Sequence, residues 1–400
     1  MKTSIRVQLS IMMFLQFFIW GTWYATMGTY LFKINFDGAD VGNIFSTVSL
    51  AAIVSPLFVG IIADRFFPAQ QVLGALHLIG AGILYWVSTI TSPGSFYWIL
   101  LLYSICYMPT LAIVNAVAFY QMDDPGKEFP TIRVLGTIGW IVAGLVIGNM
   151  ELEDSHLQFV VGAIVSVIMG IYCFFLPNTP PKAKGEQVNI SKLLGLDALK
   201  LMSKRNFGVL VISSLLVSIP LSFYYAFANP FFNEEGMVNA ASKMTLGQAS
   251  EIIFLILMPW FFKRLGVKKM IAIGIIAWIT RYLLFAYGDN DTMVWMFYMG
   301  IILHGICFDF FFVTGQIYVD EAAPEELRSS AQGLITLATY GVGMYIGSVV
   351  AGQVVDRFSI SVSNGSTVHS WFDIWMVPAA LAAIVLIIFL IFFREEKNNN

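Results

Sequence analysis

Two acidic residues of this 400-residue chain lie inside stretches that are otherwise apolar. Asp309 falls near the middle of the run 293–319, where His304 is the only other group that carries charge near neutral pH. Glu251 is the only acid of residues 244–262. A carboxylate at the centre of a membrane costs roughly 2.5–3.5 kcal/mol on insertion scales. Such a group is kept when it carries an ion, a proton or a polar substrate, or when a partner neutralises it.

The composition is that of a membrane protein. Hydrophobic residues make up 58% of the chain and charged residues 12%, with a mean hydropathy of +0.76. No soluble domain of this length has such a balance. Cys106, Cys173 and Cys307 lie in apolar runs without a C-x-x-C pattern, which argues against a disulfide framework or a zinc site. The sequence also has no P-loop and no hydrolase motif. We therefore expect a transporter rather than an enzyme, with no metal and no cofactor.

Twelve apolar stretches are long enough to cross a bilayer, which takes about 20 residues per helix. They cover residues 7–32, 41–63, 69–90, 96–119, 132–150, 158–177, 207–229, 244–262, 269–287, 293–319, 329–355 and 371–393. Lys and Arg gather in alternate loops and at both ends, and cytoplasmic loops are the ones that collect these residues. The sequence predicts an all-α membrane protein of twelve transmembrane helices with both termini cytoplasmic.

The longest polar segment divides these stretches six and six. We expect an N-terminal bundle over residues 1–177, a cytoplasmic linker over 178–206 and a C-terminal bundle over 207–400. Five apolar residues of the linker recur at helical spacing and predict a short amphipathic helix on the membrane surface. They are Ile190, Leu193, Leu194, Leu201 and Met202.

Gly60, Asp64 and Arg65 form a motif at the end of the second stretch, and Gly352 and Asp356 repeat its spacing at the end of the eleventh. Glycine lets two helices approach closely. An aspartate can accept hydrogen bonds from the N-terminus of a neighbouring helix, and an arginine can tie the loop to the facing half. We interpret Gly60, Asp64 and Arg65 as a conformational latch.

Further polar residues share helix faces inside the apolar stretches. Gln248 and Glu251 are three residues apart, and Arg133, Thr137 and Trp140 follow at i, i+4 and i+7, so each set lies on one face. In lipid these groups must face the interior of the bundle and find partners.

Arg281 and His77 also lie inside apolar stretches, and we expect both to have structural roles. For Arg281 we expect an ion pair with one of the two acids, and the same pairing is the alternative to a functional role for Arg133. For His77 we expect a packing residue with one hydrogen bond. Asp309 and Glu251 are the better functional candidates.

Several segments of the chain resemble the nucleoside:proton symporter family, the bacterial nucleoside permeases of the major facilitator superfamily. The resemblance extends over almost the whole length and is nearest to a poorly characterised branch of transporters in that family. The segments that carry it are Trp20–Trp23, Tyr107–Thr110, Phe129–Gly139, Leu194–Ala198, Gln248–Glu251, Phe308–Phe311 and Arg328–Gly333.

The resemblance implies nucleoside import coupled to protons and carries over a set of site residues. Residues that match the family's nucleoside site are Arg133, Thr137, Gln248, Glu251, Phe308 and Asp309, with Trp140 at an aromatic position of the family. Ser222 and Tyr225 stand where nucleoside-transporting members carry amides, and His304 stands where they carry a tyrosine. These three departures leave the substrate itself open.

On this interpretation the chain is a monomeric carrier of a bacterial inner membrane that alternates access by rocking two bundles around a midplane site. Its partners are a nucleoside, protons and the lipid bilayer, and not nucleic acid. Trp140 and Phe308 flank the base, Thr137 and Gln248 bond its polar edges, and Asp309 or Glu251 carries the proton. Arg133 or His304 is the neighbour that tunes this acid. A carrier of another small polar solute and a membrane sensor stay open as alternatives.

Overall fold

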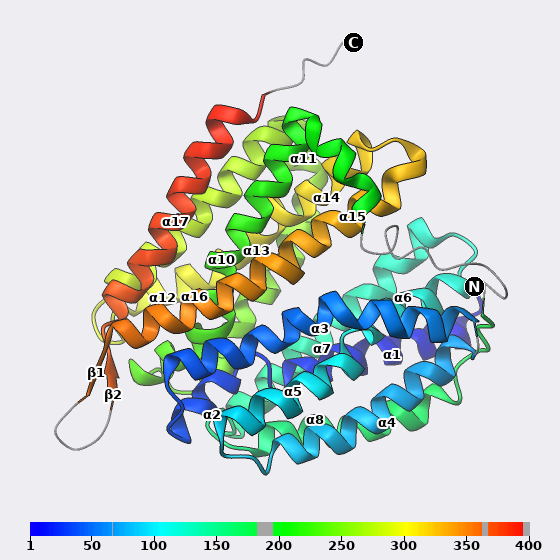
Figure 1. Ribbon diagram of the computed structural model, residues 1–400, viewed down its shortest axis with the longest axis horizontal. Helices are drawn as coiled ribbons and strands as arrows, with labels where there is room; N and C mark the ends of the chain where they lie inside the picture. The colour runs from blue at the N-terminus through cyan, green and yellow to red at the C-terminus, as the bar shows by residue number, and fades with distance from the viewer. Residues whose placement is uncertain (66, 182–194, 362–366, 395–400) are drawn as a thin grey trace. The chain divides into compact units, whose positions relative to one another are not determined.

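The computed structural model describes residues 1–65, 67–181, 195–361 and 367–394, without the side chains of 56–65 and 361. Within these ranges the chain is almost entirely helical (Figure 1). Residue contacts divide it into two compact units. The first comprises Met1–Phe36, Asn43–Asn189 and Asn239–Thr245, and the second comprises Asp37–Gly42, Ile190–Val238 and Leu246–Asn400.

The helices of the first half of the chain are long and apolar. They are α1 (Thr3–Gly21), α2 (Met27–Lys33), α3 (Gly38–Arg65), α4 (Ala69–Val87), α5 (Pro93–Tyr107), α6 (Thr110–Tyr120), α7 (Pro125–Asn149) and α8 (Leu157–Cys173). Helix α1 packs along α7, and α4 packs along α8 and α5 (Figure 1). Pro93 and Pro125 occupy the first turns of α5 and α7, where a missing backbone N–H costs nothing.

The second half contains the remaining elements. They are η1 (Leu196–Ser203), α10 (Arg205–Glu234), α11 (Ala240–Tyr287), α12 (Val294–Ile302), α13 (His304–Phe308), η2 (Asp309–Val313), α14 (Thr314–Ala322), η3 (Glu325–Leu327), α15 (Arg328–Thr336), η4 (Leu337–Gly343), α16 (Met344–Arg357), β1 (Ser359–Ser361), β2 (Thr367–His369) and α17 (Trp371–Phe392). Helix α10 is the centre of this half and packs against α16, α17 and η4. The strands form one antiparallel hairpin, with Ile360 opposite Val368.

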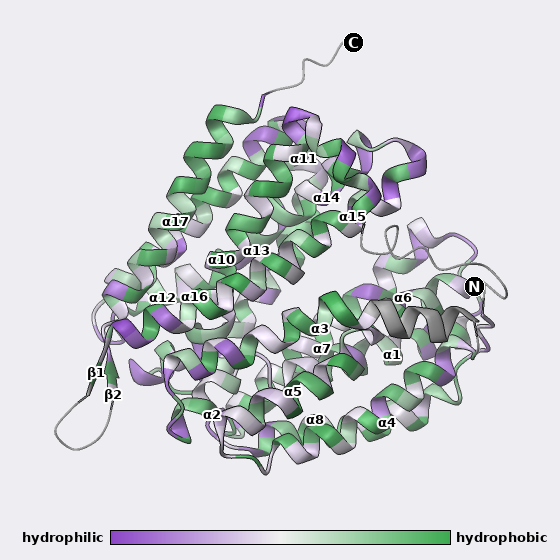
Figure 2. Ribbon diagram, viewed as in Figure 1, coloured by the Kyte–Doolittle hydropathy of each residue, from purple (hydrophilic) through white to green (hydrophobic). Residues whose placement is uncertain are grey.

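Ten helices of the described residues are long and apolar enough to cross a membrane, and α8 is a shorter apolar helix. Apolar residues follow the lengths of these helices, and hydrophilic residues gather towards their ends (Figure 2). The chain is thus a multi-pass membrane protein.

Breaks fall inside the first and the fourth predicted stretch, and a further break separates the eighth from the ninth. The first is helical only to Gly21 and resumes at Met27. The fourth breaks between Tyr107 and Thr110, because Pro109 lacks the N–H that a continuous helix needs. The 48-residue helix α11 contains Gly266 in a left-handed conformation, φ 69°, so its two parts are separate helices.

The predicted amphipathic helix of the linker is only partly described. Ile190, Leu193 and Leu194 lie outside the described residues. The part that the structure describes is the 3₁₀ helix η1, in which Leu201 is buried and Met202 is half-buried.

Candidate functional site

The structure brings Glu251 and His304 together in the second unit. Nε2 of His304 lies 3.9 Å from Oε2 of Glu251. The His304 side chain is buried, whereas the Glu251 side chain is 24% exposed. A buried imidazole therefore lies beside the carboxylate of a side chain that is partly exposed.

A glycine-lined crossing of α11 and α13 holds these two residues in place. A Cβ atom on Gly305 would lie 2.7 Å from the backbone oxygen of Ser250, and one on Gly247 would lie 3.1 Å from Cβ of His304. The Ser250 hydroxyl accepts a 3.0 Å hydrogen bond from the backbone N–H of Gly305. The backbones can approach this closely only because neither glycine has a side chain.

Arg281 is fully buried, and its partners are not the ones that the sequence predicted. Its Nε donates to the backbone oxygen of Gly300 at 2.9 Å, and its Nη2 lies 3.2 Å from Nδ1 of His304. The guanidinium carbon lies 3.8 Å from the centre of the Tyr224 ring. No acid of the described residues lies within ion-pair distance of it. The predicted ion pair is therefore wrong: a carbonyl, an imidazole and an aromatic face stabilise this cation instead.

Three rings extend this cluster along α10 and α13. The Tyr224 and His304 rings are stacked with centroids 5.3 Å apart, and those of His304 and Phe308 are 6.0 Å apart. Phe308 is half-buried, so it presents an aromatic face next to the buried imidazole. Such a face suits a planar ring of a ligand.

Asp309 is fully buried at the start of the π-helical segment η2. Within the described residues, neither of its carboxylate oxygens has a hydrogen-bond partner. The carboxylate lies near enough to Glu251 for the two negative charges to repel each other. Short π-helical segments are frequent at functional sites. A buried acid without a fixed partner is the kind of group that can take up and release a proton.

The other predicted residues of the second unit differ in their surroundings. Gln248 and Tyr225 are half-buried, and Tyr225 packs against Tyr224. Ser222 is buried, and its hydroxyl lies 2.9 Å from the backbone oxygen of Ser218 and 3.2 Å from that of Met344. The single hydroxyl hydrogen of Ser222 is therefore committed to the backbone.

In the first unit, Arg133, Thr137 and Trp140 are all half-buried on α7, as one face of a helix requires. The Arg133 guanidinium lies 4.2 Å from the centre of the Phe17 ring, and the Trp140 ring is 5.5 Å from that of Trp20.

The same helix also packs against α1 through glycines. A Cβ atom on Gly139 would collide with the backbone oxygen of Phe14, and one on Gly136 would lie 2.6 Å from the Phe17 ring. These two glycines explain the close packing of α1 and α7, which fixes the orientation of the polar face.

His77 of α4 is part of a buried polar network and makes two hydrogen bonds rather than the one predicted. Its Nδ1 lies 3.3 Å from the Ser166 hydroxyl and its Nε2 lies 2.9 Å from Oε1 of Gln16. The Gln16 amide donates to the Thr110 hydroxyl at 2.7 Å. Since all these side chains are buried and mutually bonded, the network has a structural role.

The predicted latch, Gly60, Asp64 and Arg65, lies in the part of α3 whose side chains are not described. Its repeat can be seen within the second unit. The Asp356 carboxylate accepts hydrogen bonds from the backbone N–H groups of Gly38 and Ala39, at 2.6 and 3.0 Å. An aspartate of this motif therefore caps the first turn of a helix, as the sequence predicted for Asp64.

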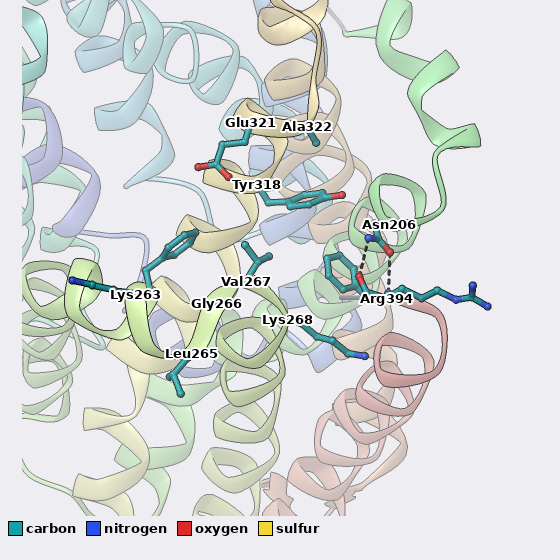
Figure 3. A pocket seen from close by; sticks show the side chains of 12 residues that line it. Asn206, Lys263, Leu265, Gly266, Val267, Lys268, Tyr318, Glu321, Ala322 and Arg394 are labelled. Carbon is teal, nitrogen blue, oxygen red and sulfur yellow. Dashed lines mark hydrogen bonds between the residues drawn. The ribbon is translucent and has the colours of Figure 1, made fainter. Parts of the chain in front are cut away.

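A separate pocket of about 590 Å³ lies in the second unit near the ends of α10, α14 and α17 and the Gly266 break (Figure 3). The Asn206 side chain bonds both backbone groups of Arg394 there, at 2.9 Å each. Lys263 points to one side of this view, whereas Lys268 and Arg394 extend to the other (Figure 3). None of the predicted site residues lines this pocket. The described residues also contain no group of three or more His, Cys, Asp and Glu side chains that fits a metal ion.

Sequence reasoning missed two contributions to the cluster. No spacing along the chain indicated that the Tyr224 ring would pack against both Arg281 and His304. Gly247 directly precedes Gln248, and Gly305 directly follows His304. A glycine inside an apolar stretch is the signal that could have found them.

The chain matches known proteins over its full length. The family model described as nucleoside H⁺ symporter matches residues 1–398. The candidate nucleoside transporter YegT of Escherichia coli (strain K12) is 41% identical over 408 residues, which cover 100% of this chain and 95% of YegT. The nucleoside permease NupG of the same strain is 34% identical over 398 residues, covering 96% of this chain and 94% of NupG.

A solved structure agrees with these relatives. The crystal structure of an aspartate-to-alanine variant of NupG matches with a TM-score of 0.90 at 32% identity, covering 98% of this chain and 100% of that chain. Because the family model and the relatives span nearly all of the sequence, the chain belongs to the nucleoside H⁺ symporter family.

Proposed function

We propose that this protein imports nucleosides together with protons by alternating access, using Asp309 or Glu251 as the coupling acid. Family membership makes the chain a proton-coupled nucleoside transporter. The observation that carries the residue assignment is the fully buried Asp309 carboxylate, which has no hydrogen-bond partner in the described part of the chain. A proton that binds there removes the cost of a buried charge, and its release restores that cost.

Substrate contacts are proposed for six of the predicted site residues. Phe308 and Trp140 stack on the base, Gln248 and Thr137 bond its polar edges, and Arg133 and Glu251 bond further polar groups. The support is that all six side chains are half-buried, so each keeps part of its surface accessible. Ser222 is less suited to this role, because its hydroxyl hydrogen is committed to backbone oxygens.

The membrane arrangement is proposed from the sequence and the helix lengths. Helix α11 has 48 residues, and about 20 residues cross a bilayer, so its two parts count as two spans. With α8 as a further span, the ten long helices become twelve. We place both termini and the 178–206 linker in the cytoplasm of a bacterium, with six spans in each half of a monomer in the inner membrane.

The topology can be tested by cysteine labelling. Ser203 and Val238 are both exposed, and they precede and follow α10. In a cysteine-free background, an impermeant maleimide added to intact cells should label Val238→Cys but label Ser203→Cys only after permeabilisation. Labelling of Ser203→Cys in intact cells would contradict the proposed orientation.

The substrate class can be tested by thermal unfolding of the purified protein. A ligand at 100 times its Kd adds about 2.7 kcal/mol to the free energy of unfolding, so a saturating nucleoside should raise the Tm. Nucleobases and sugars serve as controls and should shift the Tm less. A larger shift with another solute class, and none with any nucleoside, would overturn the nucleoside assignment.

A further inference from the structure

We infer that Arg281 is a positioning residue that holds His304 in the tautomer whose Nε2–H faces Glu251. This inference deepens the proposed function, because Glu251 is one of the residues assigned to substrate and proton. It concerns a pair of residues, Arg281 and His304, that the second unit brings together from α11 and α13.

The argument starts from the guanidinium, which has N–H donors and no acceptor and keeps its proton under all ordinary conditions. Its Nη2 lies 3.2 Å from Nδ1 of His304, so this contact is a hydrogen bond only if Nδ1 carries a lone pair. A proton on Nδ1 would instead face another N–H. The ring proton of His304 therefore sits on Nε2.

The guanidinium is itself fixed in position. Nε donates to the backbone oxygen of Gly300 at 2.9 Å, and the plane lies over the Tyr224 ring at 3.8 Å. Trp278 adds a second aromatic face, with its ring centre 5.3 Å from the guanidinium carbon. Since a planar fork with two bound edges cannot rotate freely, the donor that meets Nδ1 stays in place.

With Nδ1 as the acceptor, the N–H donor of the His304 ring is at Nε2, on the side of Glu251. Nε2 is 3.9 Å from Oε2 of Glu251, and a small side-chain rotation brings this N–H within hydrogen-bond length of the carboxylate. The Glu251 side chain is partly exposed, whereas His304 and Arg281 are buried. Arg281 thus acts on the Glu251 carboxylate through one buried ring. Its role is to fix which ring nitrogen of His304 carries the hydrogen-bond donor.

The tautomer can be measured directly by ¹⁵N NMR of the histidine rings in the purified protein. The chain has only four histidines, and loss of one signal set in His304→Gln assigns His304. We expect a protonated Nε2 and an unprotonated Nδ1 in the wild type. In Arg281→Lys, which keeps the charge but loses the fork, we expect both tautomers. A protonated Nδ1 in the wild type, or an unchanged spectrum in Arg281→Lys, overturns the inference.

A binding experiment with uridine and adenosine tests the consequence for the site. His304→Asn keeps a polar group near the Nδ1 position but loses the donor towards Glu251. Binding should therefore weaken, with a Kd about tenfold higher. His304→Gln keeps a donor near the Nε2 position and should be affected less. If Arg281 acts through His304, Arg281→Lys should raise the Kd in the otherwise wild-type protein. The same substitution should cause little further increase of the Kd in the His304→Gln variant. Independent, additive effects would mean that Arg281 is only structural and would overturn the inference.

Arg264→Gln is the matched control. Arg264 also lies on α11 and over an aromatic ring, with its guanidinium carbon 4.0 Å from the Trp260 centroid, but outside the cluster. It should leave the His304 spectrum and the Kd unchanged. If the protein bound no nucleoside at all, the proposed substrate would fall, and the NMR experiment would still decide the tautomer.

Discussion

Asp309→Asn should abolish the accumulation of nucleoside against its gradient while nucleoside binding is retained. Asparagine has nearly the shape of a protonated aspartate and keeps one hydrogen-bonding oxygen, but it cannot titrate. The wild-type carboxylate is fully buried, so each release of a proton creates a costly charge that the transport cycle must accommodate. The measurement is uptake of radiolabelled nucleoside into energised cells, with and without a protonophore, together with the Kd of the purified variant.

Two further substitutions make this test specific. Asp291→Asn changes an exposed aspartate of the loop before α12 and should leave uptake unaffected. Glu251→Gln should weaken binding if Glu251 mainly contacts the substrate. If Asp309→Asn accumulates nucleoside at the wild-type level, Asp309 is not the coupling acid, and Glu251 becomes the candidate.

Gly139→Ala should strongly destabilise the first unit. The added Cβ would collide with the backbone oxygen of Phe14, which cannot move aside as the end of a flexible side chain can. Helices α1 and α7 would have to separate, and overpacking of this kind typically costs about 1–3 kcal/mol. Thermal unfolding in detergent should show a lower Tm, and less folded protein should reach the membrane.

Gly82→Ala is the control for this effect. Gly82 also lies inside a helix, α4, but a Cβ there meets nothing within 4 Å. This substitution should leave the Tm unchanged or raise it slightly, because alanine favours a helix over glycine by roughly 1 kcal/mol. Equal effects of the two substitutions would show that α1 and α7 do not depend on the glycine contact.

The helix faces could be predicted from the sequence because they follow from spacing alone. Residues at i, i+4 and i+7 share one side of any α-helix, so Arg133, Thr137 and Trp140 had to lie together on α7. Apolar length likewise located the helices, since a bilayer sets how many residues a span needs.

The partners across helices could not be predicted in the same way. Arg281 was expected beside an acid because opposite charges attract, but the structure gives it the Gly300 carbonyl, His304 and the Tyr224 ring. These contacts depend on how α10, α11 and α13 rotate and slide against each other. That arrangement is set by small residues such as Gly305 and by backbone approach, neither of which has a fixed spacing along the chain.

The π-helical segment η2 bears on how chains of this kind can differ in length. A π turn holds one more residue than an α turn, and the extra residue is accommodated locally without rotating the helix beyond it. Deleting one residue between Asp309 and Val313 would therefore restore an α-helix and leave the faces of α13 and α14 nearly aligned. Single-residue insertions and deletions among relatives are expected inside this helix as well as in loops. Positions after Asp309 must then be matched by their place in space rather than by counting along the sequence.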